Sequence, residues 1–188
     1  MRGNLSNEIV SVKIEEGSKR PVALHEKSFF GKIDEDTLNL SLIEASYLVE
    51  KDRLDVYEDD VLCSLSYFID LLKERDLYAN YIVYRDLKDR GYVIKTGFKY
   101  GSEFRLYDRG RSPGKGHSDF LVKIIHENYN IPSLDFASNV RVSHGVNKKL
   151  LLAIVDDDFD ITYYNVEWTR PKFNLRKILY FNRLIILL

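Results

Sequence analysis

The six residues from Leu150 to Val155 are all apolar, and this run constrains the fold more than any other feature of the sequence. A strand with one solvated face alternates apolar and polar side chains, whereas a strand covered on both faces is continuously apolar. The run therefore predicts a central strand with packed elements on each side. Four further runs have strand-like composition, and they lie at 92–96, 103–108, 120–125 and 161–166.

A helix is predicted between the third of these strands and the central one. Ser133 is a candidate N-cap, and Gly145 is a candidate stop. Leu134, Ala137 and Val140 follow at helical spacing and would face the sheet. A helix inside a set of strands predicts a C-terminal domain with a mixed central sheet.

The first third of the chain is typical of a small α/β unit. Residues 9–15 alternate like a strand, and Ser41 with Glu44 forms a capping-box pattern that predicts a helix over about 41–52. A second helix is expected to start near Ser64 or Ser66.

The charged joint at 73–76 is the best candidate for a domain boundary. A third helix is expected over 77–90, with Tyr81, either Tyr84 or Arg85, and Leu87 on one stripe, and with Gly91 as its stop.

The sequence thus predicts an α/β (α+β-like) fold, with a small N-terminal α/β domain at 1–75 and a second domain at 76–171. Residues 172–188 form a hydrophobic tail that ends in LIILL. This run is too short to span a bilayer. It could be a strand edge or a contact for another chain.

Composition excludes several classes of protein. The chain has 28 basic and 29 acidic residues and a formal net charge of −1, so nucleic-acid binding would need a local basic patch. Cys63 is the only cysteine, which excludes an intrachain disulfide and a thiolate metal cluster. No segment resembles a signal peptide or a membrane span. We expect a cytoplasmic protein with no membrane association.

Three side chains are candidates for chemistry, although each has an ordinary explanation when it is considered alone. His117 follows a loop rich in glycine and cations, which suits phosphate binding but is also typical of a solvated basic loop. Tyr107 ends a predicted strand and could be a core or rim tyrosine. Lys148 lies where the predicted helix meets the central strand, and could be a solvated cation at a helix end.

The acidic run at 156–160 also has competing interpretations. Asp156, Asp158, Asp160 and Glu167 have the spacing of positions 1, 3, 5 and 12 of an EF-hand loop. However, Ile161 stands where that loop needs glycine, and the flanking runs predict strands rather than helices. Calcium is therefore rejected, and a hairpin turn rich in aspartate is the better interpretation.

Several blocks of the chain, in order and at matching spacing, resemble the tRNA-splicing endonuclease family. The similarity covers roughly residues 8 to 170. The blocks that carry it are VYRDL through RGYVIKTGFKYG (83–101), FRLYDRG (104–110), HS (117–118), RVSHGVNKKL (141–150) and LAIVD to YY (152–164).

The resemblance implies a restriction-endonuclease-like C-terminal domain and an active site made of Tyr107, His117 and Lys148. It further implies that introns are excised from precursor tRNA at bulge–helix–bulge junctions, without metal or cofactor, leaving 2′,3′-cyclic phosphate and 5′-hydroxyl ends. The ribose 2′-OH would attack, Tyr107 would act as base, His117 as acid, and Lys148 would stabilise the phosphorane. This reaction classes the enzyme as a lyase.

The same resemblance implies contacts with RNA and with other subunits. Arg141 would stack on a bulged base, and Arg109 would contribute to RNA binding. Asn147 stands where the family suggests a basic residue. The aspartates Asp156, Asp157, Asp158 and Asp160 would dock in a basic groove of another subunit, most simply in a homotetramer.

Three alternatives stay open. The chain could be a catalytic subunit that requires a separate structural subunit. It could be a non-catalytic structural or RNA-binding subunit of a splicing endonuclease, which the intact set of Tyr107, His117 and Lys148 disfavours. It could also be a metal-dependent DNA nuclease, for which the sequence offers no convincing carboxylate cluster.

Overall fold

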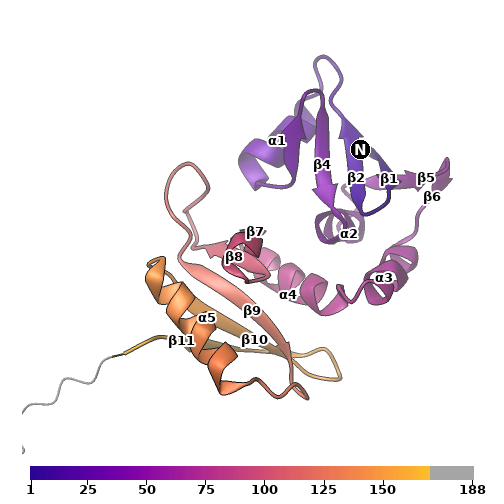
Figure 1. Ribbon diagram of the computed structural model, residues 1–188. Helices are drawn as coiled ribbons and strands as arrows, with labels where there is room; N and C mark the ends of the chain where they lie inside the picture. The colour runs from indigo at the N-terminus through magenta and orange to yellow at the C-terminus, as the bar shows by residue number, and fades with distance from the viewer. Residues whose placement is uncertain (170–188) are drawn as a thin grey trace, which may run out of the picture.

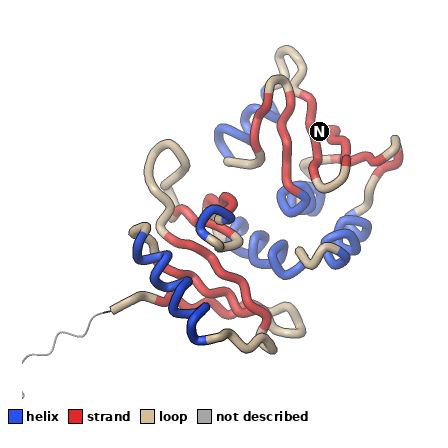
Figure 2. The backbone as a smooth tube through the Cα atoms, in the orientation of Figure 1, coloured by secondary structure: helices blue, strands red, loops and turns tan. Residues whose placement is uncertain are grey.

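The computed structural model describes residues 1–169 as two mixed sheets with helices between and around them (Figures 1 and 2). This arrangement confirms the α/β class. The predicted tail at 172–188 lies outside the described residues, as do 170 and 171. The division at 75/76 stays a prediction.

The first sheet has the strand order β3-β4-β2-β1-β5-β6, and all pairs are antiparallel except β1 with β5. Val10, Val12, Leu38 and Leu40 alternate along β2 and β4 and are buried. The strands are β1 (Arg2–Ser6), β2 (Ile9–Lys13), β3 (Lys32–Asp34), β4 (Thr37–Ser41), β5 (Asp55–Glu58) and β6 (Val61–Leu62).

Two helices pack on this sheet, and one of them was missed from the sequence. α1 (Lys19–Ser28) carries Pro21 in its first turn, where a proline is tolerated because the amides there have no partner inside the helix. α2 (Leu42–Glu50) starts at the predicted capping box, which is confirmed. The Glu44 carboxylate accepts from the amides of Ser41 and Gly31, at 3.0 and 2.9 Å, and so ties α2 to the segment after α1.

Two helices connect the sheets. α3 (Leu65–Glu74) is capped by the Ser64 hydroxyl, as expected. α4 (Tyr78–Asp89) buries Tyr81, Tyr84 and Leu87, so the stripe runs through Tyr84 rather than Arg85. Gly91 follows its end with φ of 88°, a conformation that glycine adopts without strain.

The second sheet has the order β11-β10-β9-β8-β7, with β9 and β10 parallel and the other pairs antiparallel. Every strand predicted in this half is present, within one residue at each end. The elements are β7 (Val93–Thr96), a 3-10 turn (Phe98–Tyr100), β8 (Phe104–Tyr107), β9 (Phe120–His126), α5 (Ser133–Gly145), β10 (Lys149–Val155) and β11 (Ile161–Val166).

β10 is the central strand that the apolar run predicted. Ala153 and Val155 join the core shared with α4, while Leu150 and Leu152 belong to the opposite face, against which α5 packs. Side chains on a strand alternate between its faces, so an uninterrupted apolar run can serve two packed layers at once.

Three expectations about α5 were wrong. Ser133 is the first helical residue rather than the cap, which is Pro132. Leu134 is 81% exposed, because the helix contacts the sheet through its second half, where Val140 is buried. Gly145 lies inside the last turn, and the left-handed residue that ends the helix is Asn147, with φ of 54°.

Hydrogen bonds connect α4 to the helices that pack on the first sheet. The Tyr47 hydroxyl donates to Asp89 at 2.8 Å, and the Tyr81 hydroxyl donates to Glu50 at 2.7 Å. The Lys88 ammonium donates to the Ser28 carbonyl at 2.9 Å. Burial is the main cause that lowers the pKa of Lys88 to about 8.

The half-buried Lys88 predicts an unusual dependence of stability on pH. A lysine whose pKa is lowered by folding binds fewer protons in the native state than in the unfolded state. Burial of the charged form therefore lowers the free energy of unfolding by its full amount below pH 8, and this loss disappears as the pH rises toward 10.5. Urea unfolding should show wild-type stability rising by about 2 kcal/mol between pH 8 and 10 relative to Lys88→Met. A constant difference between the two proteins across this range would contradict the assignment.

Candidate active site

The ends of three neighbouring strands meet at one edge of the second sheet. Leu106 pairs with Phe120, and Phe120 pairs with Lys149, so β8 ends where β9 and β10 begin. Tyr107 is the last residue of β8 and Lys148 directly precedes β10. Neighbouring strands lie about 4.8 Å apart, so the backbones of Tyr107 and Lys148 are separated by roughly 10 Å, with the segment after His117 between them.

The end of α5 fixes the backbone position of Lys148 at this edge. The Lys148 amide donates to the Ser143 carbonyl at 2.8 Å, and the Asn147 amide donates to the His144 carbonyl at 3.0 Å. This pair of bonds is the Schellman motif, which requires a left-handed residue at the position of Asn147. Asparagine tolerates that conformation better than other residues with a side chain, which accounts for an asparagine where a basic residue was expected.

The Lys148 ammonium lies next to the segment that carries His117. Its Nζ donates to the Ser118 carbonyl at 2.9 Å. Ser118 is buried, whereas the His117 side chain is exposed at the mouth of the loop. A contact with the backbone of the next residue, Ser118, therefore holds the half-buried lysine beside the segment that carries the exposed histidine.

Asp119 fixes both ends of the loop at 108–119, and sequence reasoning missed it. Its carboxylate accepts from the Asp108 amide at 3.0 Å and from the Arg111 guanidinium. Its own amide donates to the Leu106 carbonyl at 2.8 Å, and its carbonyl accepts from the Lys149 amide at 3.0 Å. These contacts depend on the register of three strands, so nothing in the local sequence could have indicated them.

The Tyr107 ring is buried, but its hydroxyl forms no hydrogen bond with the described part of the protein. The residue is 4% exposed, and the Arg105 guanidinium lies 5.9 Å from the ring centroid. Within residues 1–169, the phenol oxygen has no hydrogen-bond partner. A hydroxyl with no structural bond is free to form a hydrogen bond with a substrate.

The two candidate RNA-binding arginines lie near the same edge. Arg109 directly follows Asp108 in the loop, and its guanidinium is 5.7 Å from the Tyr92 ring centroid. Arg141 is exposed on the second half of α5, the part of the helix that leads to Lys148. Neither side chain forms an ion pair in the described part of the chain.

The acidic run lies at the opposite end of the sheet. It forms the turn between β10 and β11, as predicted, with the Phe159 amide donating to the Asp156 carbonyl at 3.1 Å. Asp156 also accepts the Asp160 amide at 2.8 Å through its side chain. Asp157 lies 3.5 Å from His126 and 3.3 Å from Asn128, while the carboxylate of Asp158 makes no bond within residues 1–169.

Comparisons with known proteins show the family of the chain. A family model described as the catalytic C-terminal domain of tRNA intron endonucleases matches residues 77–163, and a model of the N-terminal domain matches residues 1–69. The chain belongs to the tRNA intron endonuclease family.

Three individual relatives cover between 78% and 91% of the chain. A tRNA-splicing endonuclease of Methanothermobacter thermautotrophicus is 56% identical over 91% of this chain and 99% of its own length. A tRNA-splicing endonuclease of Thermococcus kodakarensis is 46% identical over 78% of this chain and 87% of its own length. A tRNA-splicing endonuclease of Methanococcus vannielii is 37% identical over 88% of this chain and 93% of its own length.

Two further findings concern metal ligands and membrane-spanning helices among the described residues. Within residues 1–169, no set of three or more histidine, cysteine, aspartate or glutamate side chains is grouped as metal ligands. None of the helices in this part of the chain has the length and apolarity to cross a bilayer.

The helix end at Asn147 yields a test of how Lys148 is placed. Asn147→Val should destabilise the protein by about 1–2 kcal/mol in urea unfolding, because a β-branched residue is strained at positive φ. Asn147→Gly is the matched control and should be within about 0.5 kcal/mol of wild type, since glycine adopts this conformation freely. Equal stability of the valine and glycine variants would show that the turn does not need a left-handed residue.

Proposed function

We propose that this chain excises introns from precursor tRNA by metal-independent cleavage of RNA at bulge–helix–bulge junctions. The single observation that carries the proposal is the meeting of Tyr107, the His117 segment and Lys148 at one edge of the sheet. Membership of the tRNA intron endonuclease family supports this choice of substrate.

The proposed reaction needs no nucleophile from the protein. The ribose 2′-hydroxyl attacks the adjacent phosphorus, and its proton passes to Tyr107, which reacts as the phenolate and becomes a neutral phenol. The bond from phosphorus to the 5′-oxygen breaks, and His117, which reacts as the imidazolium, donates a proton to that oxygen and becomes a neutral imidazole. The products are a 2′,3′-cyclic phosphate and a 5′-hydroxyl, so atoms and charges balance without water or an oxidant.

Lys148 stabilises the negative charge that builds up between these two proton transfers. The pentacoordinate phosphorane carries more negative charge than the starting diester, and a fixed cation beside it stabilises the transition state preferentially. The contact from Lys148 to the Ser118 carbonyl keeps the ammonium at the edge before substrate arrives. Such preorganisation avoids a reorientation cost during the reaction.

Recognition of the junction would depend on unpaired nucleotides. Bulged bases can be splayed out and stacked on planar cations, whereas the grooves of an RNA helix offer little base-specific information. The exposed Arg141 and the loop residue Arg109 are the proposed contacts, and both lack a competing carboxylate among residues 1–169. Precursor tRNA is the expected partner.

The proposed assembly is a homotetramer held in part by the acidic turn. Asp158 and its neighbours present negative charge that a basic groove of another subunit would complement. The alternative is a non-catalytic structural or RNA-binding subunit of a splicing complex, and the presence of all three residues Tyr107, His117 and Lys148 argues against it.

Single substitutions test the catalytic roles. Tyr107→Phe, His117→Ala and Lys148→Met should each lower the single-turnover cleavage rate by on the order of 10²–10⁴, while RNA binding persists. Lys149→Met is the matched control, because this lysine pairs with Glu167 at 2.9 Å and lies next in sequence. Reactions are run on intron-bearing precursor tRNA in EDTA, and the termini are identified. Undiminished rates in all three variants would end the proposal, and loss of wild-type activity in EDTA would favour a metal-dependent nuclease.

The assembly is tested by mass in solution. The wild-type chain should form a species of about 88 kDa, four copies of 22.0 kDa. Replacing Asp157 and Asp158 together by Asn should shift it to a smaller species, since this change removes charge but leaves the turn bonds of Asp156 in place. A matched pair, Glu15→Gln with Glu16→Gln, alters exposed charge elsewhere and should leave the mass unchanged. A wild-type monomer would contradict the homotetramer.

A further inference from the structure

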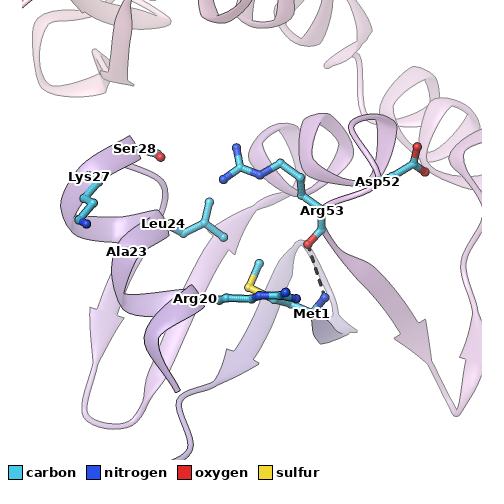
Figure 3. A pocket seen from close by; sticks show the side chains of 8 residues that line it. All are labelled: Met1, Arg20, Ala23, Leu24, Lys27, Ser28, Asp52 and Arg53. Atoms are coloured by element: carbon cyan, nitrogen blue, oxygen red, sulfur yellow. Dashed lines mark hydrogen bonds between the residues drawn. The ribbon is translucent and has the colours of Figure 1, made fainter. Parts of the chain in front are cut away.

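A basic cavity lies in the N-terminal domain, between α1 and the turn that follows α2 (Figure 3). Its volume is about 390 Å³. Leu24 and Met1 supply apolar surface, and the rim carries Arg20, Lys27 and Arg53. We call it the α1 cavity.

The cations of the α1 cavity are not neutralised. Within residues 1–169, the side chains of Arg20, Lys27 and Arg53 form no ion pair and no hydrogen bond. Asp52 is the one carboxylate that lines the cavity, and Figure 3 shows it beyond Arg53, pointing away from the other two cations. Because the whole chain has a net charge of −1, such a concentration of unpaired positive charge is a local property of this surface.

The positive field extends from the cavity toward the second domain. The Arg53 charge is one of the causes, after burial, that lower the pKa of Lys88. The Lys88 ammonium in turn donates to the carbonyl of Ser28, another residue that lines the cavity. The cavity therefore adjoins the end of α4.

The end of α4 leads directly to the candidate active site. Lys88 is in the last turn of α4, β7 starts at Val93, and Val93 pairs with Tyr107. The five residues from Lys88 to Val93 span at most about 17 Å, and paired strand residues lie about 5 Å apart. The Cα atoms of Lys88 and Tyr107 are thus within roughly 22 Å, a distance that a few nucleotides of an RNA strand can bridge.

We propose that the α1 cavity binds phosphodiester groups of the RNA substrate that flank the cleaved junction. The inference rests on the proposed function, because it assigns the cavity to the same substrate. Two arginine guanidinium groups and a lysine suit backbone phosphates, which arginine can hold through two parallel bonds. Phosphate contacts of this kind position a substrate without reading its sequence.

The test compares RNA binding by charge-reversed variants over a range of salt concentrations. The substrate is a precursor tRNA with full-length arms beside the junction. Arg20→Glu with Lys27→Glu should weaken binding at least tenfold at low salt. It should also reduce the slope of log affinity against log salt by about 1.4–1.8, since each lost phosphate contact removes about 0.7–0.9. Cleavage at saturating RNA should keep its wild-type rate, because the cavity does not touch the reacting atoms.

Three controls make the outcome decisive. Lys19→Glu reverses charge on the same helix outside the cavity and should change affinity less than twofold. Arg53→Gln removes one cation without reversing charge and should reduce the slope by about 0.7–0.9. An RNA with its arms shortened to the junction should bind wild type and the double variant equally.

Two results would overturn the inference. Equal affinity and slope for the double variant and Lys19→Glu would do so, and so would an equal loss of affinity for the full and shortened RNAs. Both results leave the proposed function standing if wild type still cleaves precursor tRNA. A wild-type protein that neither binds nor cleaves the RNA would instead remove the proposed function itself.

Discussion

The parallel pairing of β9 with β10 is the constraint on which the candidate site depends. Parallel neighbours need a crossover connection, and α5 provides it between His126 and Lys149. The register of this pair, together with the antiparallel register of β8 on β9, decides which residues share the edge. A slip of one residue would turn Lys148 toward the other face of the sheet, because side chains alternate along a strand.

The packing of β10 makes such a slip costly. One set of its side chains belongs to the core shared with α4, and the other set lies on the face where α5 packs. The register is therefore held by burial on two faces rather than one. Asp119 adds polar bonds that connect the end of β8, the loop at 108–119 and the start of β10. The exposed His117 is thus carried by a loop whose ends are fixed.

The sequence predicted the second sheet better than the first, and for a physical reason. Strands of four to seven residues with strong apolar character, such as β9 and β10, carry a clear pattern. β3, β5 and β6 have two to four residues, and Val56 is the one buried residue among them, so their local composition carries little signal. The missed helix α1 contains Pro21, which breaks a helix in most positions but not in its first turn.

The candidate site was predicted in part. The positions Tyr107, His117 and Lys148 came from family resemblance, and their roles stay predictions, but the strand register accounts for why residues so far apart in sequence share an edge. The expected helix stop at Gly145 was wrong because the Schellman turn places its left-handed residue two positions later, at Asn147. Asp119 and the α1 cavity could not have been predicted, since both depend on contacts between segments distant in the chain.

The most direct measurement of the central claim uses a substrate whose 5′-bridging oxygen at the cleaved bond is replaced by sulfur. A thiolate leaves without needing a proton, so this substrate bypasses a general acid but still needs the developing phosphorane charge to be stabilised. If His117 and Lys148 act on one phosphorus as proposed, the sulfur substrate restores cleavage by His117→Ala to near the wild-type rate and does not rescue Lys148→Met. Equal rescue of both variants, or of neither, would contradict the account.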